Sequence, residues 1–414
     1  MVNGSHKDSR SSQPCLHDLL VVNQVAGPLM VQMLEDFCRA GVCCKIVTGW
    51  VDSENPRQLP FEIIPAGKLE KSPNLKRIWS WMLFTLQACR RMIRHRKTPV
   101  LMVTNPPWPM LLMPLLKRIL GLRYVLLIYD IYPDVLERMG RMRRGGLIGR
   151  LWRLLSRKSL LEADGVITLG PYMAETLVGH LCSGDKCPIE VISNWADTDF
   201  IRPIEKAQNP FAARHGLTDR FVVTYSGAFG ATHDVESIVK AAEMLTDLSE
   251  VHFLLIGGGT RRKEVRRLVE QKNLPNLTLL PFQPFDMLPY SLPAADCSIV
   301  CLDEGYEGLS VPSKTYYAMA AGSALLAISR DNTELTDIVK QYQCGFHILP
   351  HRPEDLAEAV RRLCGDRELL EKCKTASRRA AEENFARNIS TRRYLEYLRK
   401  KLCQDRLLQA HFRA

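Results

Sequence analysis

The chain has 414 residues, of which 46% are hydrophobic and 24% are charged, as is usual for a globular protein. Its length exceeds what one hydrophobic core supports and fits two domains of about 200 residues each. No uncharged apolar run approaches the roughly 18 residues of a membrane-spanning helix, so no membrane span is predicted.

The N-terminal segment and the cysteines indicate where the protein resides. The segment Met1–Pro14 is polar and lacks the apolar stretch of a signal peptide. We therefore expect a disordered tail over residues 1–15 and a cytoplasmic protein. The thirteen cysteines are scattered and never form the two CxxC pairs of a zinc site. In a reducing compartment they are expected to be small buried side chains, and the sequence predicts neither a metal nor a cofactor.

From residue 16 onward, short apolar runs alternate with stretches of helical periodicity. The runs predict buried strands at Leu16–Asn23, Cys43–Thr48, Phe61–Pro65, Val100–Thr104, Tyr124–Tyr129, Gly165–Leu169 and Glu190–Ser193. A polar, proline-containing stretch over residues 194–209 indicates a linker. The alternation then restarts, with strands at Phe221–Ser226, His252–Ile256, Leu277–Pro281, Ser298–Leu302 and Ala324–Ser329, and with helices from about Val235, Arg261, Pro312 and Asn332.

This alternation predicts an α/β protein of two facing doubly wound, Rossmann-like domains, in which ligands bind at the carboxyl ends of the strands. The predicted parts are an N-terminal domain over residues 16–195, a linker over 196–215, a second domain over 216–375 and C-terminal helices over 376–414.

Three loops of the second domain follow predicted strands and suit a phosphate-containing ligand. Glycine lets a phosphate approach the backbone, and the start of a helix attracts anions. The residues concerned are Gly227 and Gly230 in the first loop, Gly258 and Arg262 in the second, and Ser313 and Lys314 at the start of a helix that stops at Gly322. Each loop alone also fits a capped helix or a solvated surface turn.

In the first domain, Asp130 follows a fully apolar strand and is the best candidate for an acid that points into the cleft. The alternative is that Asp130 caps the helix that follows, since Asp is common at that position.

Two segments of the first half combine basic and apolar side chains. Residues 1–200 hold 26 Lys and Arg against 18 Asp and Glu, and the cations concentrate in Leu75–Lys97 and Arg138–Lys158. Basic amphipathic helices with Trp and Leu are typical of segments that lie on anionic membranes, while solvated faces of core-packed helices are the alternative. The chain has no aromatic–basic module of a nucleic-acid-binding kind, so no nucleic-acid partner is predicted.

The chain resembles a known family over about residues 16–400, more strongly in the second half than in the first. Its segments follow the order and spacing of glycosyltransferase family four, the group 1 transferases, which are retaining enzymes of the GT-B fold; these segments are Leu254–Gly259, Leu279–Pro284, Ala294–Asp296, Val311–Lys314 and Ala318–Gly322. The Val-Pro-Ser-Lys variant, and Asp130-Ile131-Tyr132-Pro133-Asp134 in the first half, are similar to bacterial transferases of capsule, O-antigen and colanic-acid synthesis. The resemblance implies a GT-B fold with a C-terminal helix that returns to the first domain.

The chain departs from the family at the paired glutamates. The ribose-binding glutamate falls on Tyr317, and the other falls on Leu309, or on Glu307 if the loop is longer. The histidine often found before the first-domain aspartate is Tyr129.

The chain also departs from the family at the cations and at one glycine pair. The Arg and Lys that hold the diphosphate fall on Ala228 and His233, and the Gly-Gly of the first loop is reduced to Gly27. We therefore expect Lys314 and the Arg261-Arg262-Lys263 cluster to hold the diphosphate instead.

The resemblance implies a metal-independent, retaining transfer of a sugar from a UDP- or GDP-sugar to a lipid-linked or saccharide acceptor in cell-surface polysaccharide synthesis. The protein would act peripherally at the inner face of the cell membrane, on an anionic surface. Catalysis would depend on Asp130 and Lys314, and donor binding on Gly27, Gly227, Gly230, His233, Gly258, Arg262, Phe282, Glu307, Ser313 and Tyr317. Two alternatives stay open: a nucleotide-sugar epimerase or hydrolase, and a catalytically inactive GT-B scaffold or binding subunit.

Overall fold

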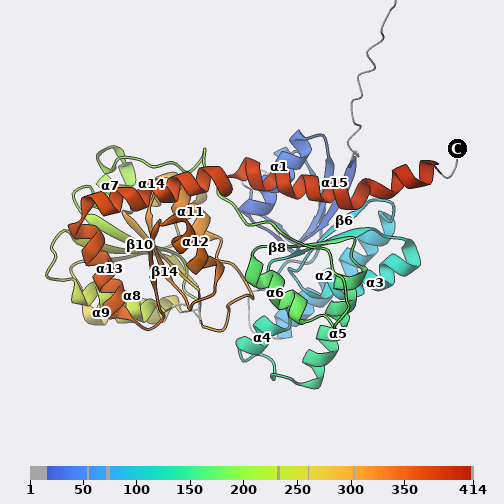
Figure 1. Cartoon of the computed structure of the whole chain (residues 1–414), viewed down its shortest axis with the longest axis horizontal. Helices are drawn as coiled ribbons and strands as arrows, with labels where there is room; N and C mark the ends of the chain where they lie inside the picture. The colour runs from blue at the N-terminus through green and yellow to red at the C-terminus, as the bar shows by residue number, and fades with distance from the viewer. Residues whose placement is uncertain are drawn as a thin grey trace, which may run out of the picture. The chain divides into compact units, whose positions relative to one another are not determined.

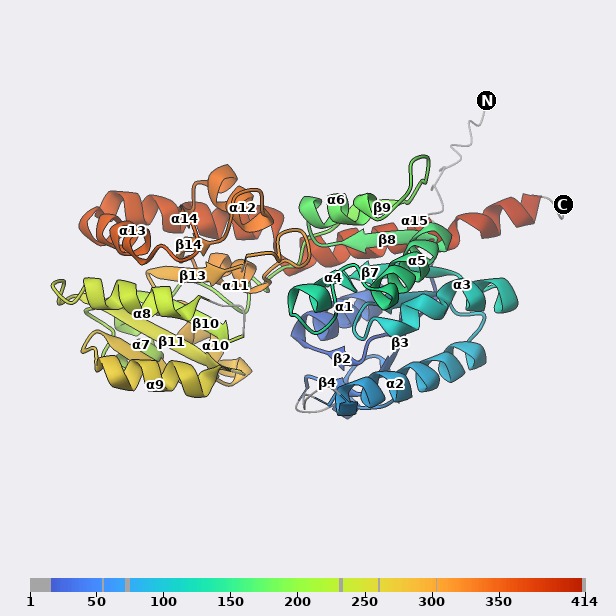
Figure 2. The same ribbon diagram turned by 90° about the horizontal axis from the view of Figure 1, so that it is seen from below.

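The computed structural model describes residues 16–53, 56–70, 75–230, 234–259, 261–302 and 304–411, so the predicted tail lies outside the described residues. Contacts divide the chain into two compact units, one of Met1–Leu126, Glu162–Gly165 and Arg392–Ala414 and one of Leu127–Leu161 and Val166–Thr391. Two larger sheets, each flanked by helices, form the framework (Figures 1 and 2). Within the described ranges, no helix is both long and apolar enough to cross a bilayer.

The first sheet has seven strands in the order β5-β3-β1-β6-β7-β8-β9. Strand β1 pairs in parallel with β3 on one side and β6 on the other. Its central strands are buried along nearly their whole length, because parallel strands covered on both faces need apolar side chains on both sides. The elements of this half are β1 Asp18–Val22, β2 Val25–Ala26, α1 Pro28–Arg39, β3 Cys43–Thr48, β4 Trp50–Val51, η1 Pro56–Gln58, β5 Glu62–Pro65, α2 Leu75–Arg94, β6 Val100–Val103, α3 Trp108–Leu120, β7 Tyr124–Ile128, α4 Asp134–Arg138, α5 Leu147–Glu162, β8 Gly165–Thr168, α6 Pro171–Gly179 and β9 Ile189–Val191.

The second sheet has six parallel strands in the order β12-β11-β10-β13-β14-β15. The register places Gly227 of β10 beside Gly257 of β11, so the loops after these two strands begin side by side. The elements of this half are η2 Lys206–Gln208, α7 Pro210–Arg214, β10 Phe221–Ala228, α8 Val235–Met244, β11 Val251–Gly258, α9 Arg262–Lys272, β12 Leu277–Leu280, η3 Phe285–Met287, α10 Leu288–Ser291, β13 Cys297–Cys301, α11 Lys314–Ala320, β14 Ala324–Ile328, α12 Glu334–Tyr342, β15 Gly345–Ile348, α13 Pro353–Gly365, α14 Arg367–Asn384 and α15 Arg387–His411.

Two hydrophobic cores cover the two faces of the second sheet. Alternate residues of a strand point to opposite faces. Val223 and Leu255 accordingly pack with helices α8 and α13, while Val222 and Leu254 pack with Phe211 of α7. Residues 196–215 were predicted to be a linker, but helix α7 lies within this range and packs into the core.

The structure confirms the predicted α/β fold class, and every predicted strand is present with its ends shifted by a few residues at most. The edge strand β15 was not predicted, because Gly345-Phe346-His347-Ile348 lacks an apolar run. The basic segment Arg138–Lys158 is not one helix: α4 ends at Arg138, α5 begins at Leu147, and two glycines with positive φ, Gly140 and Gly145, lie in the turns between them.

The C-terminal helix packs against residues of the first sheet's half, as predicted. Arg123 donates hydrogen bonds to the carbonyl oxygens of Lys401 and Leu402 in α15. Arg399 of the same helix donates to the carbonyl oxygen of Ala40, 3.2 Å away.

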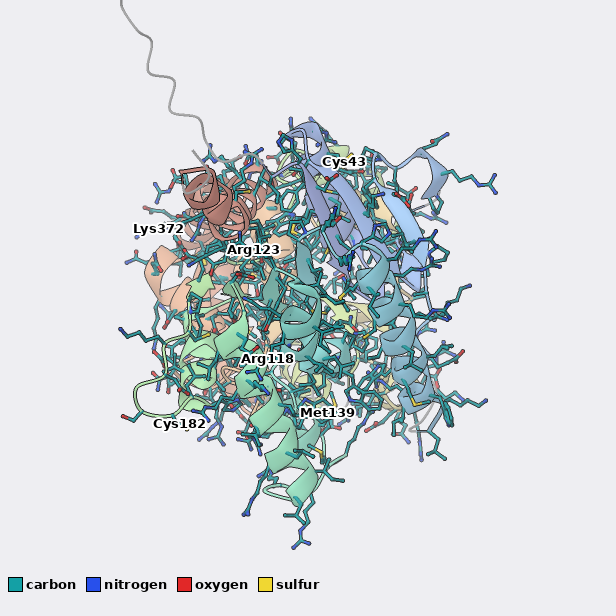
Figure 3. All side chains as sticks on the ribbon, turned by 90° about the vertical axis from the view of Figure 1, so that its right-hand side faces the viewer. Cys43, Arg118, Arg123, Met139, Cys182 and Lys372 are labelled. Atoms are coloured by element: carbon teal, nitrogen blue, oxygen red, sulfur yellow. The ribbon has the colours of Figure 1, made fainter. Side chains whose placement is uncertain are left out.

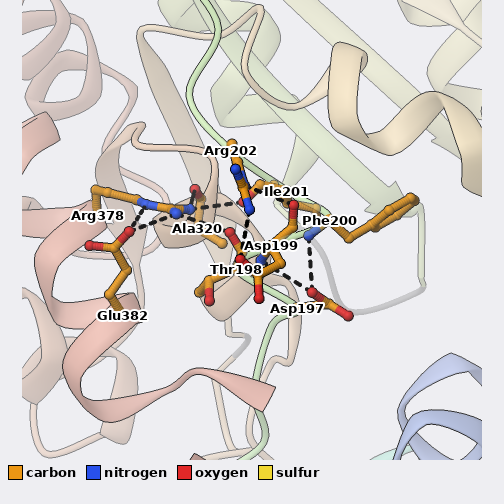
Figure 4. Close-up of polar contacts among 9 residues, drawn as sticks. All are labelled: Asp197, Thr198, Asp199, Phe200, Ile201, Arg202, Ala320, Arg378 and Glu382. Carbon is orange, nitrogen blue, oxygen red and sulfur yellow. Dashed lines mark hydrogen bonds and ion pairs between the residues drawn. The ribbon is translucent and has the colours of Figure 1, made fainter. Parts of the chain in front are cut away.

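An arginine of α14 ties the predicted linker to the end of α11 (Figure 4). Arg378 donates to the carbonyl oxygens of Thr198 at 2.9 Å and Ile201 at 2.8 Å. It also donates to the carbonyl oxygen of Ala320 at 2.6 Å, in the last turn of α11, and pairs with Glu382. Because the last carbonyls of a helix have no partner inside the helix, Arg378 satisfies one of them.

Candidate functional site

Backbone hydrogen bonds join the loop that follows β10 to the loop that follows β11. Gly227 has a φ of +154°, which glycine adopts more readily than other residues. The buried Phe229 then donates its N–H to the carbonyl oxygen of Gly258 at 2.6 Å and accepts from the N–H of Arg261 at 3.1 Å. Gly230 follows Phe229 in the chain. The predicted site residue His233 lies outside the described residues.

Lys314 lies at this strand end, as its predicted role requires. It is the first residue of α11, after the N-cap Ser313, whose side chain makes no capping bond. The Lys314 Nζ donates to the Tyr225 hydroxyl at 3.0 Å and lies 4.2 Å from the centre of the Tyr225 ring. A Cβ atom at Gly227 would lie 3.5 Å from Cδ of Lys314. The structure therefore brings Gly227, Ser313 and Lys314 together, and an ammonium here suits a phosphate oxygen.

The predicted cation cluster after β11 is divided in two. Arg261 pairs with Glu264 at 2.7 Å and Glu236 at 2.6 Å, and the hydrogen bond with Glu264 is the main reason that its pKa is raised. Arg262 has no carboxylate partner in the described part of the chain, and its Nε is buried without a hydrogen bond there. Of the two arginines, Arg261 is thus held by two carboxylates and Arg262 is not, and the role of the Arg261-Arg262-Lys263 cluster in holding the diphosphate stays a prediction.

Gly258, Arg262 and Phe282 come together beside this loop. A Cβ atom at Gly258 would lie only 2.9 Å from the ring of Phe282 and 3.8 Å from Cδ of Arg262. The Phe282 ring is 57% exposed, which is unusual for a large apolar side chain beside a sheet edge. An exposed ring next to an arginine offers a planar group a surface on which to stack.

The two aspartates of the Asp130–Asp134 motif differ in environment. The Asp134 carboxylate is engaged by neighbouring side chains: it pairs with Arg153 at 2.9 Å and lies 3.6 Å from His180. Burial alone would raise the pKa of Asp134, but hydrogen bonds from His180 and Arg153 outweigh burial and lower it. Asp130 has no hydrogen bond or ion pair among the described residues, and burial raises its pKa to about 6.

Asp130 does not cap the following helix. Helix α4 has Pro133 as its N-cap residue and no side-chain capping bond. The capping alternative for Asp130 is thus excluded, and Asp130 lies two residues beyond the end of β7.

The loop that carries Glu307 lies against the segment after Asp130. The N–H of Ile131 donates to the carbonyl oxygen of Leu309 at 3.2 Å. One carboxylate oxygen of Glu307, Oε1, is buried without a hydrogen bond among the described residues. Tyr317 of α11 is close to Tyr129, whose pKa is raised by burial first and by Tyr317 second. The structure therefore gathers Asp130, Glu307 and Tyr317 around one loop.

Gly27 belongs to the first sheet's half of the chain. It is the N-cap of α1 in the other compact unit, its backbone is extended, and an added Cβ would meet nothing within 4 Å. Nothing in its local structure requires a glycine.

One residue of the site was missed from the sequence. Tyr225 contacts Lys314 through both its hydroxyl and its ring. The available signal was the position of Tyr225 in the strand, two residues before Gly227, but a tyrosine in a buried strand usually indicates core packing. Across the described residues, no three His, Cys, Asp or Glu side chains gather as a metal site would require.

Two family models match the chain. The model of glycosyl transferases group 1 matches residues 208–380, and the model of glycosyltransferase family 4 matches residues 29–200. Together they take in most of both sheets.

Curated relatives and solved structures agree with these models. A probable glycosyltransferase of Pseudomonas aeruginosa, WbjE, is 27% identical over 81% of this chain and 82% of its own length. A protein of Escherichia coli described as the colanic acid biosynthesis glycosyl transferase WcaI is 25% identical over 69% of this chain and 70% of its own.

Among solved structures, sucrose-phosphate synthase of Thermosynechococcus elongatus has a TM-score of 0.73 at 17% identity, over 93% of this chain and 98% of that one. HepE of Anabaena, solved with UDP-glucose, has a TM-score of 0.69 at 13% identity, over 92% of this chain and 99% of that one. These likenesses show the GT-B fold, and with the two family models they place the chain among the group 1, family four glycosyltransferases.

Proposed function

We propose that the protein transfers a sugar from a nucleotide-diphosphate sugar to an acceptor in cell-surface polysaccharide synthesis. The observation that carries the proposal is the Lys314 ammonium beside Gly227 at the end of β10. The relatives WbjE and WcaI support the reaction class, and the UDP-glucose complex of HepE supports a nucleotide-sugar donor.

The chemistry requires the site to stabilise a departing nucleotide diphosphate. Positive groups aimed at the developing charge lower the barrier most when they are held in place beforehand. Lys314 supplies such a charge without a metal ion, so we propose metal-independent transfer. The Asp130 carboxyl group would orient the acceptor hydroxyl or the transferred sugar. Retention of the anomeric configuration is part of the proposal and is supported by the resemblance to the family.

A nucleotide-sugar screen tests the donor assignment. Purified protein is heated with UDP-, GDP-, dTDP- and ADP-sugars, and a ligand of the folded state raises the melting temperature by mass action. Calorimetry then compares the wild type with Lys314→Ala, for which we expect a loss of about 1.5–3 kcal/mol in nucleotide affinity. An unchanged affinity would exclude Lys314 as the diphosphate group.

Retention, metal independence and turnover are each tested by a separate measurement. Nuclear magnetic resonance of the product reports whether the donor's anomeric configuration is kept. Turnover in excess EDTA reports metal independence. Donor binding without any turnover, over a panel of lipid-linked and free saccharide acceptors, would favour the inactive scaffold instead.

We further propose that the acceptor is lipid-linked and that the protein binds anionic membrane through α2 and α5. Helix α5 exposes five large apolar side chains on one face, with Leu147 82% and Ile148 71% exposed; the other three are Leu151, Leu154 and Leu155. Figure 3 labels Met139, which precedes α5 and is also exposed.

Helix α2 likewise exposes Trp79 to 63%, and it packs beside α3 through the edge-to-face pair of Trp81 and Trp108, whose ring centres are 5.7 Å apart. Exposed apolar side chains among arginines suit the boundary between head groups and acyl chains better than water.

A further inference from the structure

We propose that Tyr225 is a positioning residue that holds the Lys314 ammonium at the end of β10 for the diphosphate of the donor. The inference rests on the proposed function, because it concerns how the same site holds its cation. It assigns a role to a strand residue that would otherwise count only as core.

The contacts of the Tyr225 hydroxyl fix its direction. The hydroxyl donates its proton to the carbonyl oxygen of Ala228 at 2.7 Å, so its oxygen can only accept from Lys314. The Lys314 Nζ donates to that oxygen at 3.0 Å and also lies 4.2 Å from the ring centre. A hydrogen bond and a cation–π contact therefore act on one ammonium group.

The tyrosine itself is rigidly held. Its side chain is fully buried, and its ring stacks on Phe229 with 5.7 Å between ring centres. The backbone of Phe229 is bonded to Gly258 and Arg261 in the neighbouring loop. A lysine side chain has several rotatable bonds, and fixing it before the ligand arrives removes an entropic cost from binding.

The hydroxyl is not needed for packing. A phenylalanine would fill nearly the same volume in β10 and keep the ring beneath the ammonium. Ala228 is exposed, so water can replace the lost bond to its carbonyl oxygen. Tyr225→Phe should therefore separate the positioning of Lys314 from the stability of the sheet.

The test is calorimetry with UDP and GDP as probes, on wild-type protein and on four variants: Tyr225→Phe, Lys314→Ala, the double variant of these two changes, and Tyr316→Phe. We expect Tyr225→Phe to weaken binding of the preferred nucleotide about tenfold, as for the loss of a charge-assisted hydrogen bond. In a Lys314→Ala background the same change should have no effect, because a positioning residue acts only through the group that it holds. Tyr316→Phe is the matched control, since Tyr316 is an equally buried tyrosine on α11, and it should bind like the wild type.

Three outcomes separate the two proposals. If Lys314→Ala binds nucleotide normally, the cation assignment fails and the positioning role fails with it. If Lys314→Ala weakens binding but Tyr225→Phe does not, only the positioning role is wrong. An equal loss from Tyr225→Phe with and without Lys314 would mean that the hydroxyl acts on the fold, which also overturns the inference.

Discussion

At the scale of single residues, Asp130 and Asp134 belong to one short motif, but their carboxyl groups have different electrostatic environments. Asp134 forms an ion pair with Arg153 and lies beside His180, whereas Asp130 has no charged partner among the described residues. A carboxyl group with a pKa of about 6 ionises within the physiological range, so its charge should control activity there.

We expect kcat/KM to fall as the pH drops below about 6, and Asp130→Asn to lower turnover on the order of a hundredfold and to remove this acid limb. The pKa of Asp130 is raised on folding, so the folded protein binds the extra proton between the ordinary carboxyl pKa and 6. Stability therefore falls as the pH rises through that window, and Asp130→Asn should melt higher than the wild type at neutral pH.

Asp134→Asn is the control for this prediction. The pKa of Asp134 is lowered on folding, so its contribution to stability is present at neutral pH and is lost on acidification. Asp134→Asn should melt lower than the wild type at neutral pH. Thermal melts at pH 5 and pH 7, with pH–rate profiles, compare the two variants. Full activity of Asp130→Asn at neutral pH would remove Asp130 from the site.

The neighbouring arginines Arg261 and Arg262 make a second matched pair. Arg261 is held by Glu236 and Glu264, and Arg262 lies beside Gly258 and Phe282. We expect Arg262→Ala to weaken nucleotide binding by about 1.5–3 kcal/mol, the range for a hydrogen bond to a charged group. Arg261→Ala should leave the affinity unchanged. Calorimetric titration with UDP and GDP measures the affinity of both variants. A larger loss in Arg261→Ala than in Arg262→Ala would contradict the assignment.

At the scale of elements, Arg378 connects three segments through one guanidinium group. It satisfies carbonyl oxygens of Thr198, Ile201 and Ala320, and its side chain is only 18% exposed. We expect Arg378→Ala to cost about 3 kcal/mol of stability, because buried carbonyl groups would lose a charged donor. Arg379→Ala, at the exposed next position of α14, should cost little. Urea unfolding of both variants measures the difference, and similar midpoints would show that water satisfies these carbonyls.

The strands could be predicted from sequence because most of them are buried apolar runs. β10, for example, starts at the predicted Phe221 and extends only two residues beyond the predicted end. β15 was not predicted because an edge strand needs fewer apolar side chains. Gly345 and His347 interrupt the apolar run by which a buried strand is recognised. The turns before Leu147 were missed because Gly140 and Gly145 stand within a basic segment that otherwise resembles one helix.

The site was only partly predictable. Lys314 and Gly227 stood out because they follow predicted strands, where a glycine lets a phosphate approach the backbone and a helix start attracts anions. The pairing of Arg261 with Glu236 could not be foreseen, because it joins helix α8 to the start of α9 over 25 positions of sequence. The role of Tyr225 depends on a contact 89 positions away in the chain.

At the scale of the whole molecule, membrane binding distinguishes a lipid-linked acceptor from a soluble one. We expect co-sedimentation with anionic vesicles and weaker binding at high salt, which screens the arginines. Because the exposed face of α5 is apolar, part of the binding should persist in high salt.

The Leu151→Ser/Leu154→Ser double variant should lose this salt-resistant part. Leu349→Ser, at another exposed apolar site that lies outside α2 and α5, is its control. A protein that pellets with neither neutral nor anionic vesicles would have solvated basic helices and, by inference, a soluble acceptor.

The path of α15 has a consequence for biosynthesis. Arg123 bonds to the carbonyl oxygens of Lys401 and Leu402, so a contact of the first sheet's half needs residues that are translated after every strand of the second sheet. On the ribosome, this half must wait through the synthesis of the entire second sheet before it is complete, whereas the second sheet has all its strands by Ile348. Nascent chains stalled before Leu402 should therefore expose the first half to proteases and chaperones longer than the second.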